Sequence, residues 1–512
     1  MSGFQYIVHI SWPIVGASLL AIVYVYTKLS FLVKLRHING SWTTKLSEIP
    51  HIWAILNEEC HIWYANVNRN YGKIAHVSPK ILATSSPELW AHINAHPGYI
   101  RSKWFYRAVR FDWRRDNIFT LTDVNEHDLR RKQMAAGYSG RENPTLENDV
   151  DIYVSQLLHL IRSNYAPEGR LLDLAEKLQF LTLDVISAIG FGKCFGLLDA
   201  DSDTHKYVES TEDGLRDVNR RLALGTWWLY FIYPKTEPNP ATATGFERMA
   251  IFCSTVVDAR EKAFKEQEKL GIVEKEDMLT SFMRNGLLGA ELKTEVLLQI
   301  AAGSDTTAGG LRGIMLYVFT NPRVYGKLLA EIDGAVASGK APPAPEIISY
   351  NQAKQLVYLQ AVIRESIRIF PPLNDPLARD TPPNGDTVLI EGQEVYLPGG
   401  ISIMPSFVEM QRDPAIYGED ADVFRPERWL DESDEKKLGR MKWANDLLFA
   451  HGKYLCLGKG IAMMEMSKVL FELLRNFEWG LANPEKPWKM ASLMGLRFIS
   501  DMWVRVDERP GA

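Results

Sequence analysis

The sequence contains few cysteines and lacks the short motifs of several common enzyme classes. Its four cysteines lie far apart, and none belongs to a C-x-x-C pair. This spacing excludes the usual zinc ribbons, iron–sulfur clusters and c-type haem attachment sites. The chain also has no G-x-S-x-G, no H-E-x-x-H and no G-x-x-x-x-G-K-[ST] sequence, which argues against the hydrolases, metalloproteases and nucleotide-binding enzymes that use them.

A strong excess of either charge is also missing. The 512 residues include 58 basic and 63 acidic side chains, which gives a formal net charge of −5. Because a nucleic-acid-binding protein is expected to carry a clustered basic excess, we predict no nucleic-acid partner. The apolar content of 46% and the charged content of 24% are typical of a folded globular protein.

One long apolar segment lies near the N-terminus. Residues Tyr6–Tyr26 contain no lysine, arginine, aspartate or glutamate, and a helix of roughly 20 such residues spans a bilayer. We predict a transmembrane anchor within residues 1–33. A cleaved signal peptide is the main alternative, although its basic start and small-residue cleavage site are missing; a buried core helix is a weaker alternative.

The charges beside this segment predict a topology. Basic residues lie only on its C-terminal side, at Lys28, Lys34, Arg36 and Lys45. The positive-inside rule then places the rest of the chain in the cytoplasm. We therefore predict a single-pass protein of the endoplasmic reticulum membrane.

The remaining residues, 34–512, contain no evident linker and are assigned to one domain. Most of this region has helical patterning, so the predicted fold class is mainly α with small β-sheets. Short strand signals occur at Ile74–Val77, Ile81–Thr84, Thr387–Ile390 and Glu394–Leu397. The last two flank Glu391-Gly392-Gln393, which is predicted to form a hairpin turn.

Cys456 differs from the other cysteines in its surroundings. It lies in the segment FAHGKYLCLGKGIA, Phe449–Ala462, between Gly452 and Gly458, and apolar helical sequence follows. Glycines let a planar ligand approach the backbone, and the start of a helix directs N–H groups at the sulfur and favours the thiolate. Such a thiolate suits an axial ligand of iron; an inert buried cysteine in a tight turn is the alternative.

A second unusual segment is AAGSDTTAGG, Ala301–Gly310, within an apolar stretch that ends at Asn321 and Pro322. Asp305 and Thr306 in the middle of a buried helix cost free energy unless they find partners, and each glycine weakens a helix by roughly 1 kcal/mol relative to alanine. Small residues let a ligand pack closely, and a hydroxyl beside a carboxylate can relay protons. A kinked core helix with a solvated polar stripe would give the same pattern.

Two further motifs are weaker when taken alone. Glu365 and Arg368 are three residues apart and therefore lie on one helical face, but such pairs are common. The segment Pro426–Arg428 supplies another arginine that can join them.

Together these motifs resemble those of the cytochrome P450 superfamily, in the same order and along essentially the whole chain. The family pattern F-x-x-G-x-R-x-C-x-G resembles Phe449–Gly458, and [AG]-G-x-[DE]-T-[TS] matches Ala302–Thr307. E-x-x-R matches the Glu365 pair, and P-E-R matches Pro426–Arg428. The loop around Cys456 and the segment Arg130–Gly140 are most similar to the fungal branch near pisatin demethylases, many of which serve secondary metabolism.

The resemblance implies the cytochrome P450 fold, a haem b cofactor and monooxygenase activity. Cys456 is then the metal ligand, and Asp305 and Thr306 are the catalytic residues that support dioxygen and deliver protons. The implied buried structural network consists of Glu365, Arg368 and Arg428. The implied further haem contacts are His127, Arg131, Arg379, Phe449, Gly452, Tyr454 and Gly458.

The chain departs from the family pattern at two of these contacts. Tyr454 stands where the family has an arginine that pairs with a haem propionate, and His127 stands where many members have tryptophan. A phenol donates one hydrogen bond but lacks the charge and the fork of arginine. Lys453, Arg131 and Arg379 are the candidates for the missing charge.

The resemblance also implies partners. Because the chain has no room for a flavin or nicotinamide domain, electrons are expected from NADPH through a separate NADPH–cytochrome P450 reductase, with cytochrome b5 as a further candidate donor. A basic face is predicted to meet the reductase. Its residues are Arg130, Arg131, Lys132, Lys453 and Lys459.

A lipophilic small molecule is the expected substrate. The family's variable segments are apolar here, at Phe105–Phe119, Leu298–Ala302, Leu373–Leu377 and Leu493–Met494, although a buried core would have the same composition. Two alternatives keep the haem: an isomerase or dehydratase that needs no external electrons, and a non-enzymatic haem-binding protein. Asp305 and Thr306 argue against the isomerase.

Overall fold

The computed structural model describes residues 15–19, 23, 26, 29–225, 238–270, 276–374 and 376–510. Within these residues the chain is mainly helical and has four small sheets, which confirms the predicted fold class. The longer helices are α3 (Ile49–Leu56), α4 (Cys60–Tyr71), α5 (Pro87–Ala95), α7 (Val124–Tyr138), α8 (Leu146–Asn164), α9 (Leu174–Phe191), α11 (Tyr207–Leu224), α12 (Gly245–Leu270), α14 (Gly289–Phe319), α15 (Pro322–Ala337), α17 (Val357–Ile369), α21 (Glu435–Asp446) and α22 (Lys459–Asn476). The shorter ones are α2 (Trp42–Leu46), α6 (Lys103–Ala108), α10 (Leu197–Ala200), α13 (Met278–Arg284), α16 (Tyr350–Ala353), α18 (Phe407–Met410), α19 (Pro414–Tyr417), α20 (Arg428–Asp431) and the 3-10 turns η2 (Leu447–Phe449) and η3 (Gly452–Tyr454).

The largest sheet joins both halves of the chain. Its strand order is β1 (Ile74–Ser78), β2 (Ile81–Thr84), β8 (Ser402–Pro405), β5 (Arg379–Asp380) and β3 (Ile100–Arg101), with β2 and β8 parallel and the other pairs antiparallel. A second sheet has the order β4 (Leu172–Asp173), β12 (Trp503–Glu508) and β9 (Phe477–Leu481). The two hairpins are β6 (Asp386–Ile390) with β7 (Gln393–Leu397), and β10 (Lys489–Leu493) with β11 (Leu496–Ser500).

The four predicted strand segments correspond to β1, β2, β6 and β7. Ile390 pairs with Gln393, so the turn between β6 and β7 consists of Glu391 and Gly392. Their φ angles are +50° and +80°, as a two-residue hairpin turn of type I′ requires. The predicted hairpin is therefore present, but its predicted turn, Glu391–Gln393, was one residue too long, because Gln393 is the first residue of β7.

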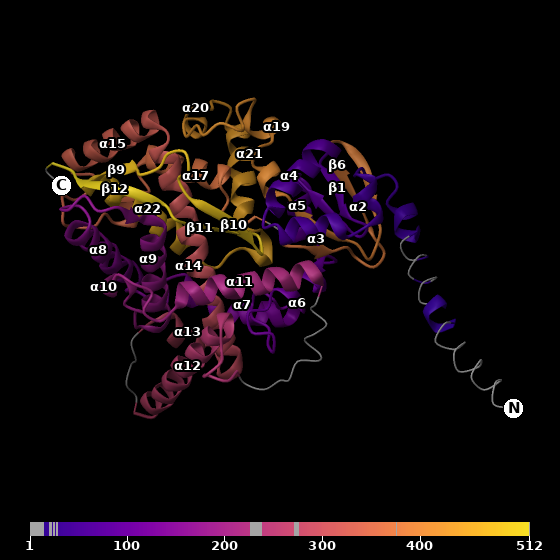
Figure 1. Cartoon of the computed structure of the whole chain (residues 1–512), viewed down its shortest axis with the longest axis horizontal. Coiled ribbons are helices and arrows are strands. Elements are labelled where there is room, and N and C mark those ends of the chain that lie inside the picture. The colour runs from indigo at the N-terminus through magenta and orange to yellow at the C-terminus, as the bar shows by residue number, and fades with distance from the viewer. Residues whose placement is uncertain are drawn as a thin grey trace.

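Helix α14 runs through the middle of the molecule, with α9, α12 and α22 packed against it (Figure 1). It ends at Phe319, and Pro322 occupies the first turn of α15, where its missing N–H has no cost. A Cβ added to Gly303 would lie 2.8 Å from Ile186 Cδ1 of α9. The glycine therefore allows the close approach of α9 to α14.

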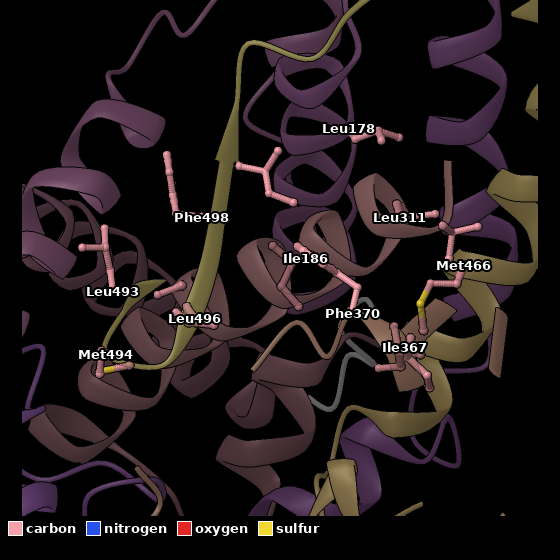
Figure 2. Close-up of a cluster of buried hydrophobic side chains, with 14 of the residues drawn as sticks. Leu178, Ile186, Leu311, Ile367, Phe370, Met466, Leu493, Met494, Leu496 and Phe498 are labelled. Carbon is pink, nitrogen blue, oxygen red and sulfur yellow. The ribbon is translucent and has the colours of Figure 1, made fainter. Parts of the chain in front are cut away.

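Apolar side chains from several elements meet beside α14 (Figure 2). Ile186 comes from α9 and Met466 from α22, while Leu496 and Phe498 come from β11. Phe370, directly after α17, lies against α14, because a Cβ on Gly313 would come within 2.8 Å of its ring. This cluster joins the β10–β11 hairpin to the central helices.

The membrane prediction requires a correction. No helix within the described residues is long and apolar enough to cross a membrane, and this finding contradicts the predicted single-pass location in the endoplasmic reticulum membrane. A span needs roughly 20 apolar helical residues, whereas the longest described helix, α14, carries charged residues such as Glu291 and Arg312. Most of the predicted anchor, Tyr6–Tyr26, lies outside the described residues.

Candidate active site

Cys456 lies on the short loop between η3 and α22. Its backbone N–H donates to Phe449 O at 2.9 Å, which closes the loop, and Gly452 has a φ of +61° that favours glycine. The backbone N–H groups of Gly458 and Lys459, at the start of α22, donate to the sulfur. The predicted arrangement of a cysteine at a helix start is therefore present.

Two observations on the Cys456 thiol point in opposite directions: the shift of its pKa and the exposure of the residue. Burial raises the pKa of the Cys456 thiol, and the Gly458 N–H and the Arg131 charge only partly oppose this shift. Yet among the four cysteines, all of which are described, Cys456 alone has an exposed side chain. Both observations hold if the sulfur faces a hollow deep in the fold. The protein alone does not lower the pKa as expected, but a bound metal cation deprotonates a coordinating thiol.

The centre of α14 combines exposed small residues with buried polar ones. Ala302 is exposed and Thr306 is half-buried, and the Thr306 hydroxyl donates to Ala302 O at 2.8 Å. Asp305 is buried, and its Oδ1 accepts from Gln179 Nε2 of α9 at 2.9 Å. The carboxyl thus bonds to α9 and not to the neighbouring threonine. Gln179 was missed by the sequence analysis, because it is one of several polar residues in α9 and nothing in the sequence distinguishes it from the others.

Two buried arginines face each other across neighbouring strands. Arg101 of β3 is the register partner of Arg379 of β5, and both side chains are buried. Their guanidinium groups lie 4.5 Å and 4.4 Å from the centroid of the Tyr454 ring. Both guanidinium groups therefore lie against the Tyr454 ring, as does the Lys453 ammonium group at 5.2 Å.

Neither arginine has a carboxylate partner in the part of the chain that the structure describes. Arg101 Nη1 donates to Ile118 O at 2.6 Å and Leu121 O at 3.0 Å. Arg379 donates to Tyr106 Oη and to backbone carbonyls, and the Nε atoms of both arginines have no hydrogen-bond partner. Two like charges directly opposite each other destabilise a sheet, and a buried unpaired charge is costly. The pair therefore fits an anionic ligand with two carboxylates.

Helix α7 adds two predicted residues to the same region. Arg131 Nη1 donates to Leu455 O at 2.7 Å, one residue before Cys456. The His127 ring lies 5.0 Å from the Tyr454 ring, and its Nδ1 lies 2.9 Å from Asp128 Oδ1. Burial and the charge of Arg101 lower the pKa of His127 to about 4, so this imidazole is neutral at pH 7.

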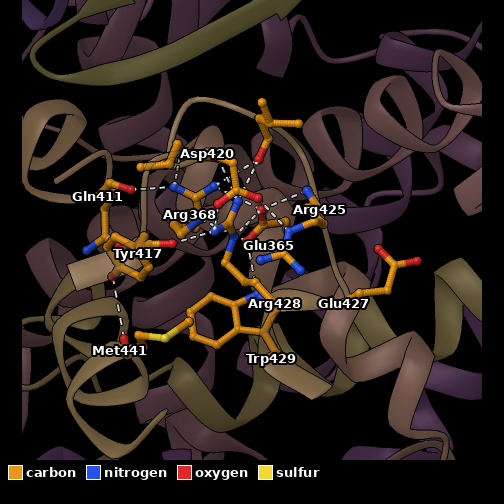
Figure 3. Close-up of polar contacts among 12 residues, drawn as sticks. Glu365, Arg368, Gln411, Tyr417, Asp420, Arg425, Glu427, Arg428, Trp429 and Met441 are labelled. Carbon is orange, nitrogen blue, oxygen red and sulfur yellow. Dashed lines mark hydrogen bonds and ion pairs between the residues drawn. The ribbon is translucent and has the colours of Figure 1, made fainter. Parts of the chain in front are cut away.

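The predicted set Glu365, Arg368 and Arg428 forms one buried cluster (Figure 3). Arg368 Nε donates to Glu365 Oε2 at 2.8 Å, and Arg428 Nε donates to Glu365 Oε1 at 3.0 Å. Trp429 Nε1 also donates to Glu365 Oε2 at 3.0 Å, and Arg428 Nη1 pairs with Asp420 at 2.8 Å. Every charge in this cluster therefore has a partner.

The predicted substrate segment Leu373–Leu377 contacts the residues that directly follow another predicted segment, Leu493–Met494. Leu373 forms an isolated bridge with Leu496, and Asn374 N donates to Gly495 O at 2.8 Å. The same hairpin is held from the other side by α11, because Met494 N donates to Asn219 Oδ1 at 3.1 Å. Asn219 was not predicted from the sequence.

The predicted basic face loses one member in the structure. Arg130 is buried and paired with Glu291 at 2.8 Å and Glu295 at 2.6 Å, both on α14. It therefore cannot meet a partner protein. Lys132 is exposed, and Lys453 and Lys459 are half-buried.

Comparison with known proteins gives one consistent family. The family model described as cytochrome P450 matches residues 49–500. Cytochrome P450 monooxygenase ABA1 of Pyricularia oryzae is 35% identical over 96% of this chain and 97% of its own length. Monooxygenase aba1 of Botryotinia fuckeliana is 35% identical over 87% of this chain and 86% of its own. A pisatin demethylase of Fusarium vanettenii is 27% identical over 93% and 89%. The chain therefore belongs to the cytochrome P450 family.

Proposed function

We propose that the chain is a haem-thiolate monooxygenase that inserts one oxygen atom of O2 into a lipophilic small molecule. When bound, haem supplies the redox chemistry that activates dioxygen. The observation that carries the proposal is the exposed Cys456 thiol, with the N–H groups of Gly458 and Lys459 directed at its sulfur.

Cys456 would hold the haem iron through its sulfur in this proposal. The two carboxylates of haem fit Arg101 and Arg379, whose positive charges have no other counter-ion among the described residues. Both guanidinium groups lie against the ring of Tyr454, and neutral His127 packs against the same ring. A Cβ added to Gly458 would lie 4.0 Å from the Cys456 sulfur, so this glycine leaves room there for a flat ligand.

Asp305 and Thr306 act on protons in this proposal. Burial raises the pKa of Asp305 to about 7, so its carboxyl both holds and releases a proton near neutral pH, as an acid–base group requires. The Thr306 hydroxyl follows it in the chain and is the half-buried one of the two. Glu365, Arg368 and Arg428 have a structural role, because they are fully buried and fully paired.

Electrons are proposed to come from NADPH through a separate reductase, since the described chain is occupied by one helical fold. Arg131, Lys132, Lys453 and Lys459 form the remaining candidate surface for this partner, which salt-sensitive turnover would reveal. The relatives named pisatin demethylase and ABA1 support a substrate from secondary metabolism.

The reduced, carbonyl-bound absorption spectrum of the full chain tests the proposal. We expect the red-shifted band of a thiolate-ligated haem in the wild type, its loss in Cys456→Ser, and its retention in the matched control Cys194→Ser. A wild-type protein without porphyrin, or a Cys456→Ser variant with an unchanged band, would disprove the thiolate assignment. Product formation without reductase or O2 would instead establish an isomerase.

A further inference from the structure

A chain of three polar side chains crosses the interface between α9 and α14. Nearly every residue of α9 is buried, and Gln179, Asp305 and Arg312 have exposed fractions of 1%, 5% and 3%. Polar groups in such an interface must satisfy one another, because water does not reach them. Their bonding pattern therefore carries information about their role.

The amide of Gln179 lies between the carboxyl and the guanidinium group. Its Nε2 donates to Asp305 Oδ1 at 2.9 Å, and its Oε1 accepts from Arg312 Nη2 at 2.8 Å. Arg312 also donates to Ala175 O, from Nε at 3.0 Å and from Nη2 at 2.6 Å. Asp305 Oδ2 is buried and has no hydrogen-bond partner within the described chain.

Only an amide fits this position with both bonds intact. A carboxamide has a donor at one end and an acceptor at the other, so it bonds to a carboxylate and a guanidinium group at once. A carboxylate at position 179 would keep Arg312 and repel Asp305, whereas a leucine would bond to neither. The contact of Gly303 with Ile186 keeps the two helices close enough for the bridge.

We propose that Gln179 is a positioning residue for oxygen activation. Its amide connects Arg312 to Asp305, occupies Oδ1, and leaves Oδ2 as the carboxyl oxygen that exchanges a proton. This inference rests on the proposed function, since the Asp305 proton matters to catalysis only if the chain activates O2.

The bridge also sets how readily Asp305 ionises. Burial raises the pKa of Asp305, while the charge of Arg312 and the hydrogen bond from Gln179 act in the opposite direction. Asp173, at the start of α9, acts on Arg312 and is the further charged group in this set. Removing the Gln179 donor should therefore raise the pKa of Asp305 further.

The experiment uses the full chain with haem and compares Gln179→Leu, the near-isosteric Gln179→Glu, and Thr182→Val. Thr182 is the matched control, because it is buried on the same helix but bonds only to the carbonyls of Leu178 and Gln179. The product formed per NADPH consumed is measured from pH 5.5 to 9. We expect the midpoint of this pH profile to move upward by about one to two units in both Gln179 variants, and to stay within about 0.3 units in Thr182→Val.

Thermal unfolding between pH 5 and pH 8 gives a readout that does not depend on turnover. A raised folded-state pKa makes stability fall as pH rises from the unfolded value towards the folded one. Gln179→Leu should extend this loss to higher pH than in the wild type, and the difference should vanish in an Asp305→Asn background. Unchanged profiles in both Gln179 variants, or an effect that persists with Asp305→Asn, would overturn the inference. A wild type that lacks the thiolate band would overturn the proposed function alone, because the unfolding comparison would still report on the Gln179–Asp305 pair.

Discussion

Two regions of the molecule bury arginines in opposite ways. In the cluster of Figure 3, Arg368 and Arg428 share the carboxylate of Glu365, and their remaining donors reach carbonyls or Asp420. Beside Tyr454, Arg101 and Arg379 face each other, and neither has a carboxylate partner in the described structure.

The difference separates polar groups that hold the fold together from polar groups that await a ligand. Buried polar atoms in native proteins are almost always hydrogen-bonded, so the exceptions need an explanation. In the Glu365 cluster the partners are all internal, and removing one leaves a charge without compensation. In the Arg101–Arg379 pair the missing partners are negative charges, which a ligand can supply.

The largest effect is expected for Glu365→Ala. This change leaves Arg368 and Arg428 buried without their shared carboxylate, and we expect a loss of about 3–5 kcal/mol in the free energy of unfolding. Urea denaturation of the full chain measures it.

The control for this prediction is Glu88→Ala, which breaks the exposed pair with Arg440. Surface pairs contribute roughly 0–1 kcal/mol. If both variants lost the same stability, the Glu365 cluster would not be the structural network that its pairing indicates.

A smaller effect is expected for Arg379→Met, which should lower the affinity for haem and not the stability of the fold. A hydrogen bond from a charged donor contributes about 1.5–3 kcal/mol. Its loss should weaken haem binding by roughly tenfold to a hundredfold. Titration of the haem-free chain with haem measures the affinity. Haem dimethyl ester, which lacks the two negative charges, should bind wild type and variant alike.

The same substitution in the paired cluster, Arg428→Met, is the control. It should destabilise the haem-free chain more than Arg379→Met does, because it removes one charge partner from both Glu365 and Asp420. An Arg379→Met variant with unchanged haem affinity and a large loss of stability would contradict the ligand role.

The smallest effect is expected for Glu465→Gln on α22. Glu465 is buried, its Oε2 has no partner in the described structure, and burial raises its pKa to about 8. Because the folded-state pKa lies above the unfolded value of 4.5, stability should fall as pH rises between these values. Glu465→Gln should remove this slope and be more stable than the wild type at pH 8.5, by on the order of 1–2 kcal/mol.

Glu472→Gln on the same helix sharpens this test. Glu472 is also buried, but it pairs with Arg475 and accepts from Ile348 N. Its substitution should lower stability across the whole pH range. If the two variants had equal thermal unfolding profiles, the partners of Glu472 would not make its contribution to stability differ from that of Glu465.

Most of the family assignment was available from short motifs. The prediction of a cytochrome P450 monooxygenase is confirmed by the family match and by the relatives. Glu365 and Arg368 were placed together because a spacing of three puts them on one helical face. The roles of Cys456, Asp305 and Thr306 stay predictions until the spectra and pH profiles are measured.

The residues that the sequence analysis misassigned or missed are those whose surroundings are set by contacts between residues far apart in the chain. Arg130 was assigned to the surface, yet it is buried against Glu291 and Glu295, which lie on one face of α14. Arg101 and Gln179 were missed because nothing near them in the sequence distinguishes them. The predicted location in the membrane was wrong, because no helix within the described residues is long and apolar enough to cross one. Most of the segment Tyr6–Tyr26, on which that prediction rested, lies outside the described residues.

The sequence by itself determined the features that depend on neighbours along the chain. These are the mainly helical class, the hairpin that turns near Glu391 and Gly392, and a cysteine at the start of a helix. Only the tertiary structure decided which buried charges have partners, as in the pairing of Arg101 with Arg379 and of Gln179 with Asp305. The physical reason is that strand register and helix packing set these distances, and neither is encoded in a local pattern of residues.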